Sequence, residues 1–153
     1  MKKILKLSIL LLGALFVLLG CSSEAKSEFV FEHNMGKQKI TYVYDKSKDS
    51  VTSLTFDISY DIANNKDMET QIRNMRESIV TEINGIEGVT VTQSDSEKEL
   101  KVTVAVDLKK FKYDDEEGRQ KAPSLYSSIH AALVKKNDIY SFEESKKNIL
   151  DEG

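Results

Sequence analysis

Few side chains in this 153-residue chain could perform chemistry, and they are scattered. Histidine occurs only at His33 and His130, far apart and in neither an H-E-x-x-H nor an H-x-H arrangement that would hold zinc. The sequence also has no G-x-S-x-G motif and no glycine-rich phosphate loop. Enzymes need a base, a nucleophile or a metal in a cleft. We therefore predict no catalytic residues, no metal site, no cofactor and no enzymatic activity; a minor envelope hydrolase that uses acidic groups is the alternative.

Two acidic segments are candidates for cation binding. Residues 45–50 (DKSKDS) place oxygens at positions 1, 3 and 5 of a calcium loop, but Ser50 stands where an EF-hand needs Gly, and Phe56 where it needs Glu. Residues 114–117 (DDEE) place four carboxylates side by side, and a weakly bound cation would relieve their repulsion. A run of like charges is usually a solvated loop. We interpret residues 114–117 in that way.

The only cysteine, Cys21, follows a basic start and the apolar run Leu7 to Leu19. A basic segment before about 7–15 apolar residues is the geometry of a secretory signal. The run ends Leu-Leu-Gly-Cys, which resembles the lipobox of bacterial lipoproteins. The resemblance implies cleavage between Gly20 and Cys21 and acylation of Cys21, with palmitate-type chains as a membrane anchor. The alternative, an uncleaved anchor, is disfavoured because thirteen helical residues rise only about 20 Å against a hydrocarbon core of roughly 30 Å.

The remaining chain is acidic and of single-domain size. Residues 1–20 carry three of the 22 basic residues and no acid, so 19 basic residues then face 25 acids, a formal net charge of −6. Nucleic-acid binding needs a basic footprint, so we predict no nucleic-acid partner. We predict a signal peptide over residues 1–20, a lipidated tether over 21–28 and one domain over 29–153.

Period-2 alternation predicts five strands. A hairpin is expected from residues 29–32 and 38–44 around the turn Asn34-Met35-Gly36, followed by a strand over 54–60 with a bulge or a late start near Val51. The other two expected strands are residues 88–93 and 100–106. The strand over 100–106 has one apolar and one solvent-exposed face. Three tyrosines, Tyr42, Tyr44 and Tyr60, join Phe56 on strand faces, where rings serve either as core or as recognition anchors; core is favoured.

Apolar spacing of 3 and 4 predicts three helices. The longest carries a stripe of Met68, Ile72, Met75, Ile79 and Ile83 behind the N-cap candidates Asn64 and Asn65, and it stops at Gly85. At this spacing the methionines are interpreted as core rather than as a binding surface. A second helix begins near Pro123 and ends near residues 136–137. A capping box of Ser141 and Glu144 opens the third.

This order, β-β-β-α-β-β-α-α, predicts an α+β domain with a largely antiparallel sheet of about five strands and helices on one face. Three phrases, Ile40-Thr41-Tyr42-Val43-Tyr44, Ile86-Glu87-Gly88-Val89 and Val106-Asp107-Leu108 with Phe111, resemble the YehR-like bacterial lipoproteins, small domains without an established activity. The similarity runs from about residue 29 to the end of the chain. It implies a lipid-anchored α+β domain and no site residues.

The sequence therefore predicts a lipoprotein at the extracytoplasmic face of the cell membrane, held by lipid on Cys21. Its domain is expected to bind an unknown protein or a small ligand without catalysis. A third hypothesis assigns a signalling function to the signal peptide itself. The stretch Ala14–Gly20 resembles lipoprotein signal tails that some Gram-positive cocci release as peptide pheromones.

Overall fold

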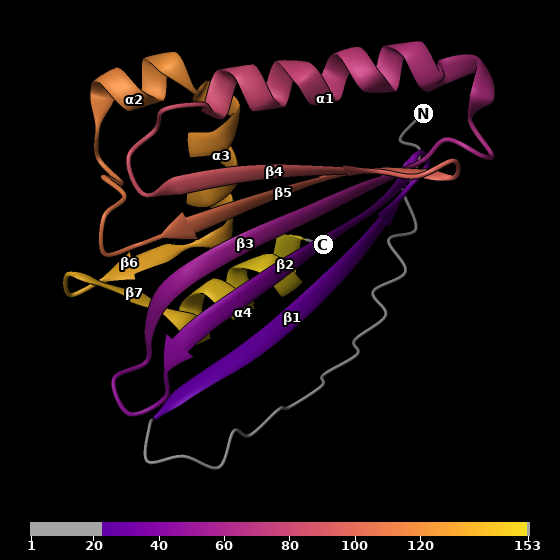
Figure 1. Ribbon diagram of the computed structural model, residues 1–153. Coiled ribbons are helices and arrows are strands. Elements are labelled where there is room, and N and C mark those ends of the chain that lie inside the picture. The colour runs from indigo at the N-terminus through magenta and orange to yellow at the C-terminus, as the bar shows by residue number, and fades with distance from the viewer. Residues whose placement is uncertain (1–22, 153) are drawn as a thin grey trace, which may run out of the picture.

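A computed structural model describes residues 23–152 of the chain. Three strands, a long helix, two strands, two helices, a short hairpin and a last helix follow one another. Every strand pair is antiparallel, and seven strands form one sheet with the helices packed on one of its faces (Figure 1). The predicted α+β class and the largely antiparallel sheet are confirmed.

The first three strands form a meander. β1 (Glu24–His33), β2 (Gly36–Asp45) and β3 (Ser50–Asp61) pair in sequence order. Gly36 follows the two-residue turn with a φ of 152°, and a Cβ there would clash with the Ser59 carbonyl oxygen. The predicted bulge near Val51 is confirmed, because the register shifts there so that Tyr44 lies opposite Val51.

Residues 24–28, predicted as part of a tether over residues 21–28, belong to the first strand instead. β1 already begins at Glu24, and its residues 24–28 pair with residues 45–41 of β2. Ala25 and Ser27 continue the alternation that buries Phe29. The polar composition of this stretch indicated a tether, but cross-strand pairing with a well-packed neighbour outweighs weak local propensity.

The central helix follows β3 through a short 3₁₀ turn, Lys66–Met68, and runs as α1 (Glu69–Ile83). Ile72 and Ile83 are buried, and Gly85 ends the helix at a φ of 81° as predicted. Met68 is 36% exposed, so the prediction that it begins the buried stripe of this helix is wrong. The two asparagines also do not cap the helix; Asn64 and Asn65 both donate to Asp61 instead.

The strands β4 (Val89–Asp95) and β5 (Glu99–Asp107) complete the main sheet, in the order β1-β2-β3-β5-β4. Val102, Val104 and Val106 of β5 are buried on the helix side, while Lys101 on the other side is exposed. The predicted one-sided pattern of this strand is therefore confirmed.

The C-terminal part holds the main departure from the prediction. It contains α2 (Glu116–Lys121), α3 (Pro123–Ala132), the hairpin β6 (Val134–Lys136) and β7 (Ile139–Ser141), and α4 (Phe142–Glu152). α3 ends four residues earlier than expected, and the hairpin raises the strands from five to seven. Its turn residues Asn137 and Asp138 have φ values of 50° and 62°, which Asn and Asp tolerate. Strands of three residues are too short to show a period.

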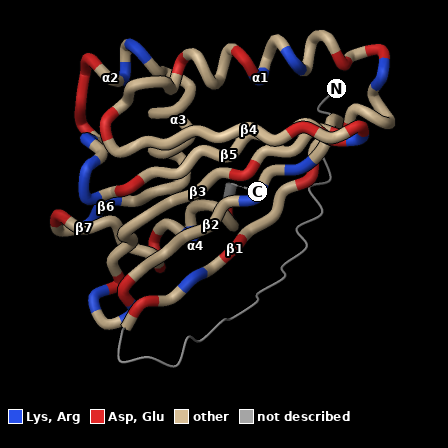
Figure 2. The backbone as a smooth tube through the Cα atoms, viewed as in Figure 1, with Lys and Arg blue, Asp and Glu red and all other residues tan. Residues whose placement is uncertain are grey.

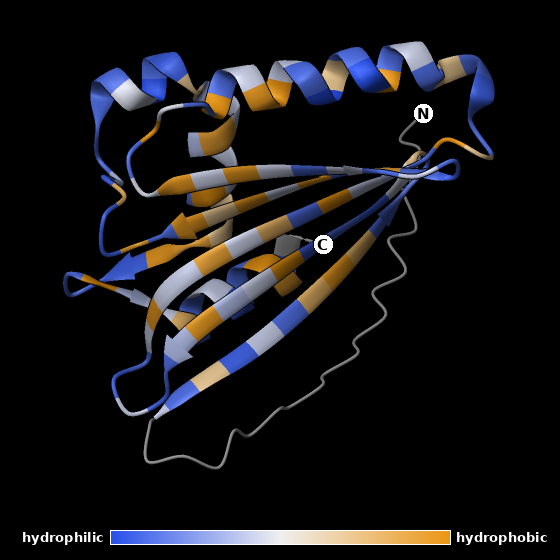
Figure 3. Ribbon diagram, viewed as in Figure 1, coloured by the Kyte–Doolittle hydropathy of each residue, from blue (hydrophilic) through white to orange (hydrophobic). Residues whose placement is uncertain are grey.

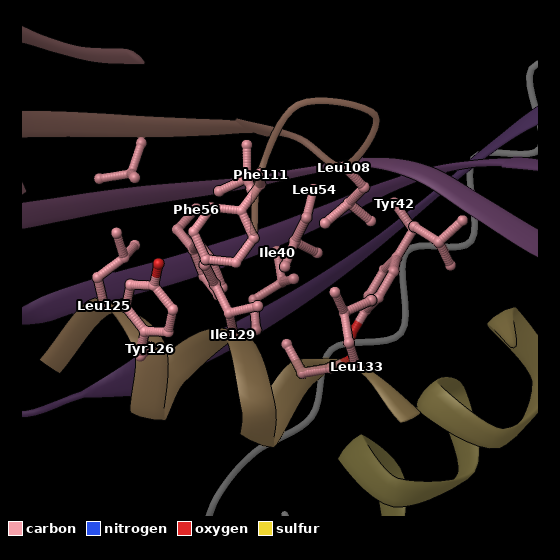
Figure 4. Packing of buried hydrophobic residues seen from close by; sticks show 14 of the residues in the cluster. Ile40, Tyr42, Leu54, Phe56, Leu108, Phe111, Leu125, Tyr126, Ile129 and Leu133 are labelled. Carbon is pink, nitrogen blue, oxygen red and sulfur yellow. The ribbon is translucent and has the colours of Figure 1, made fainter. Parts of the chain in front are cut away.

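A large hydrophobic cluster fills most of the space between the sheet and the helices, and a smaller one, formed by Tyr60, Ile62, Ile72 and Leu100, lies under the start of α1. Figure 4 shows Tyr42, Leu54 and Phe56 of the sheet facing Ile129 and Leu133. Tyr42 is fully buried, and its hydroxyl donates to the Ala132 carbonyl oxygen at 2.7 Å. All four candidate rings, Tyr42, Tyr44, Phe56 and Tyr60, are buried, which confirms their assignment to the core.

In the part of the chain that the structure describes, the other face of the sheet carries no helix, and charged residues lie along its strands (Figures 2 and 3). Lys39 lies 3.7 Å from Glu28 and 3.5 Å from Asp57, so the charges of three strands neutralise one another. Between residues 23 and 152, no helix combines the length and the apolar character that a bilayer crossing needs.

Candidate functional site

The predicted lipidation site lies outside the described residues. Gly20 and Cys21 precede Ser23, the first residue that the structure describes. Cleavage and acylation at these two residues therefore stay predictions.

The two histidines lie in different parts of the fold. His33 ends β1, and its Nδ1 lies 3.3 Å from the backbone nitrogen of Met35. His130 of α3 stacks on Tyr113 with ring centroids 4.0 Å apart, and its Nε2 lies 3.1 Å from the Tyr113 carbonyl oxygen. Each ring is held by neighbouring groups of its own, and the fold does not bring the two together.

The acidic segment 114–117 leads into α2 and contacts basic side chains. Asp114 lies 3.3 Å from Lys135, and Glu116 lies 3.5 Å from Arg119. Within residues 23–152, no group of three or more His, Cys, Asp or Glu side chains has a geometry that could hold a metal ion. Two of the four carboxylates, those of Asp114 and Glu116, thus have a basic partner.

Residues 45–50 form the turn between β2 and β3, and one of them positions the last helix. Asp49, at a φ of 49°, accepts hydrogen bonds from the Ser141 hydroxyl and from the Glu143 backbone N–H, the latter at 2.9 Å. The predicted cap is formed as well, since Ser141 Oγ accepts the Glu144 N–H at 3.2 Å. Asp49 thus joins the meander to the start of α4, which is a structural task.

The most site-like feature is an apolar hollow between α1 and α3, which we call the interhelical pocket. It has a volume of about 100 Å³. Its lining consists of Gln38, Phe56, Ile58, Ile79, Glu82, Ile83, Val104, Ser124, Leu125 and Ser128. Strands β2, β3 and β5 supply the floor, and the two helices supply the walls.

One hydrogen bond joins the two helices beside the pocket. Glu82 of α1 accepts the backbone N–H of Ser124 at 2.8 Å, which holds the start of α3 beside the end of α1. Beyond that bond the helices diverge. Ile58 and Ile79 stay half-buried as a result, although their positions in the alternation are core positions.

A polar side chain marks the floor of the pocket. Gln38 lies between Phe31 and Ile58 in one cross-strand row on the helix-covered face. A buried amide without partners costs free energy, so Gln38 belongs where water or a ligand can reach it. Its half-buried state agrees with that placement.

The size of the pocket determines what it can hold. Pockets for drug-sized ligands occupy about 300–1,000 Å³, and a cavity of about 150 Å³ holds one benzene ring. At about 100 Å³, the interhelical pocket therefore fits one aliphatic side chain or the end of an acyl chain. Gln38 on the floor of the pocket, and Ser124 and Ser128 at its margin, offer polar contacts.

Two hollows on the polar side are larger but less suited to binding. One, of about 300 Å³, lies over Lys39, Asp57 and Thr103, and another, of about 450 Å³, lies near His33 and Asp61. The Asp57 carboxylate already contacts Lys39 and accepts the Thr103 hydroxyl at 2.7 Å. A ligand there would have to replace contacts that the protein makes with itself.

Sequence reasoning did not find the interhelical pocket. The one available signal was Gln38, which stands on the apolar face of an alternating strand where a hydrophobic residue is expected. The neighbours of Gln38 depend on how α1 and α3 lie across the sheet, and no local sequence pattern predicts that arrangement.

Comparison with known proteins identifies the fold. The chain is similar to the NMR structure of the E. coli YehR protein, with a TM-score of 0.65 and 17% identity, over 88% of this chain and 91% of that one. No protein-family model and no curated protein sequence matches the chain. The resemblance to YehR expected from the sequence is thus confirmed at the level of structure, and the chain has a YehR-like fold.

Proposed function

We propose that this chain is a lipid-anchored lipoprotein at the extracytoplasmic face of a bacterial cell membrane. Its domain binds a partner protein without catalysis by accepting one apolar side chain of that partner in the interhelical pocket. The observation that carries the binding function is the pocket itself, an apolar hollow of about 100 Å³ in the covered face.

The pocket supports a protein partner because of its size and its chemistry. Anchor residues in protein interfaces are single apolar or aromatic side chains that enter preformed hollows. Half-buried Ile58 and Ile79 would lose their remaining contact with water when such a side chain enters. At about 25 cal/mol per Å² of apolar area, this burial favours binding.

The position of the pocket agrees with a membrane anchor at Cys21. Along β1, Phe31 lies seven residues from Glu24 and in the same cross-strand row as Gln38 of the pocket floor. Seven residues of strand span about 23 Å. The pocket therefore lies well away from the end of the strand that follows the anchor, where a partner outside the membrane can reach it.

The anchor is tested by metabolic labelling with an alkyne fatty acid. We expect the wild-type chain to carry the label and to sediment with membranes, and the Cys21→Ala variant to lose both properties. A wild-type chain without label would contradict the proposed anchor.

The pocket is tested by photo-cross-linking in cells. A photoreactive phenylalanine analogue at Ser128, on the margin of the pocket, should cross-link a defined protein, whereas the analogue at exposed Ser127, outside the lining, should not. Ile79→Asn should abolish the cross-link, and Ser78→Asn, on the exposed side of the same helix, should leave it intact. Circular dichroism confirms that both variants fold. Equal cross-linking from positions 127 and 128 would contradict the proposal.

A further inference from the structure

The first strand leaves one side of its backbone without a partner. β1 is an end strand of the sheet and pairs only with β2, in an unbroken register from Glu24 to His33. Among the described residues, nothing lies beyond it in the plane of the sheet (Figure 1). Such an edge is a template for pairing with another strand.

The hydrogen-bond pattern shows which residues face outward. Lys46 donates its backbone N–H to the Ser23 carbonyl oxygen at 2.9 Å, so odd-numbered residues of β1 form the hydrogen-bonded pairs with β2. The even-numbered residues therefore direct their N–H and C=O groups away from the sheet. These residues are Glu24, Lys26, Glu28, Val30 and Glu32, and their side chains lie on the polar face.

The opposite end strand, β4, is shorter than β1, with seven residues against ten, and α1 runs beside it (Figure 1). Arg73 of α1 lies 3.1 Å from Asp95 at the end of this strand, and Arg76, which is 5% exposed, contacts the same carboxylate. Among the described residues, β1 has no bulge, no proline and no covering helix; of the common protections of an edge it has charged side chains, Lys26, Glu28 and Glu32. Charges of both signs disfavour some partners and favour others, so they can select a register.

The geometry points to β1 as the site where a second copy of this chain pairs antiparallel, with Phe29 on the two-fold axis. In this register, Lys26 of each copy lies opposite Glu32 of the other, and Glu28 lies opposite Val30. The two sheets then continue into one, with their helix-covered faces on the same side. Because the outward N–H and C=O groups belong to even-numbered residues, only registers that place even-numbered residues of one copy opposite even-numbered residues of the other are possible.

Charge selects this register from the others of the same parity. With Glu28 on the axis, two glutamates meet and Glu24 lies opposite Glu32. With Val30 on the axis, Glu28 lies opposite Glu32, and like charges directly opposite one another are destabilising. With Ser27 on the axis, Lys26 meets Glu28, but the overlap is two residues shorter and Phe31 stays outside it. The Phe29 register has the longest overlap without a like-charge pair, and it places half-buried Phe31 opposite Ser27.

The dimer is expected to be weak in dilute solution, because one added strand pair buries little area compared with a standard interface of about 1,600 Å². Anchoring on one membrane would raise the effective concentration and favour pairing. The proposed interface is separate from the interhelical pocket, so each can fail alone.

Charge exchange tests the register. Sedimentation of the full chain in detergent should show a concentration-dependent dimer. Lys26→Glu and Glu32→Lys should each weaken it about tenfold, since each change creates two like-charge pairs. The double variant K26E/E32K should restore it. Lys66→Glu, an exposed lysine outside the sheet, serves as the control and should have no effect.

Disulfide trapping in cells tests the same register by a second, covalent readout. Residues of a hydrogen-bonded antiparallel pair have Cα atoms about 5.5 Å apart, which suits a disulfide. Two differently tagged copies, one with Glu28→Cys and one with Val30→Cys, should cross-link on mild oxidation. The combination of E28C with K26C reports the Ser27 register, and the wild-type chain reports background from Cys21.

The proposal is supported by a 28–30 cross-link together with rescue by K26E/E32K. It is overturned by a chain that stays monomeric at every concentration and gives no cross-link above background. A dimer that cross-links only between E28C and K26C also overturns it. So does a dimer whose affinity is unchanged in K26E and E32K.

Discussion

The helix-covered face of the sheet is closed at one end and open at one corner near the other end, where Tyr60 and Leu100 are still buried. At the closed end, Leu54 is fully buried and Tyr42 is held by Ala132 and by Phe142, whose ring centroid lies 5.7 Å away. At the open corner, formed by Phe31, Gln38 and Ile58, side chains of the same strands are only half-buried. The strands present equivalent positions at both ends. Burial differs because α3 and α4 close one end, while α1 and α3 diverge over the other.

The largest effect should come from the closed end. We expect Leu54→Ala to lower the free energy of unfolding by about 2–5 kcal/mol, since it removes a fully buried side chain and leaves a cavity. Urea unfolding followed by circular dichroism measures this. A loss below that of Ile58→Ala would contradict the contrast between the two ends.

The junction that closes this end should come next. We expect Asp49→Ala to lower the free energy of unfolding by about 1–3 kcal/mol, because it leaves Ser141 and the Glu143 N–H without their acceptor. Asp49→Asn keeps an acceptor and tolerates positive φ, so it should cost less. Hydrogen exchange of the α4 amides shows whether the loss is local; equal protection in both variants would contradict this role.

The open corner should tolerate truncation better. We expect Ile58→Ala to cost about 1–2 kcal/mol, because water already reaches this side chain and the residual cavity is open. The same unfolding experiment as for Leu54→Ala provides the matched comparison on one strand. A cost equal to that of Leu54→Ala would mean that the corner is closed in solution.

The smallest effect should appear only in acid, at the turn beside the closed end. Hydrogen bonds from the Ser23 and Ser47 side chains lower the pKa of Asp45 from 3.8 to about 2. A carboxyl with a depressed pKa in the folded state contributes stability above its unfolded pKa, and this contribution is lost as the pH falls toward 2. Below that pH the group is protonated in both states.

We therefore expect the wild-type protein to lose stability relative to Asp45→Asn as the pH falls from about 4 to about 2. Urea unfolding at several pH values measures the difference between the two proteins. A difference that stays constant over this range would contradict the shift.

Much of the fold was predictable because its signals are local. The alternation of β3 and β5, the stripe of α1 apart from Met68, and the stop at Gly85 each depend on residues close together in sequence, and each is confirmed. The β6–β7 hairpin was missed because its strands have three residues each. Asn137 and Asp138, a pair that tolerates positive φ, were the available signal for its turn.

The first strand shows how composition can mislead. Residues 24–28 are polar and predicted a tether, yet they form half of β1. Their partners, residues 41–45, lie on a strand that buries Tyr42 and Tyr44, and this packing determines the pairing. It also lengthens the free edge through which we propose that two copies pair.

The sequence by itself determined the antiparallel α+β class, the main strands and the long helix, because hydrophobic periodicity is a property of consecutive residues. Tertiary structure alone decided that Gln38, Ile58, Ile79 and Ser128 line one pocket and that α1 runs beside the end strand β4 and not beside the end strand β1. Both depend on where α1 and α3 come to rest on the sheet. That placement follows from the sum of many contacts between segments distant in sequence, and no short stretch of the chain carries it.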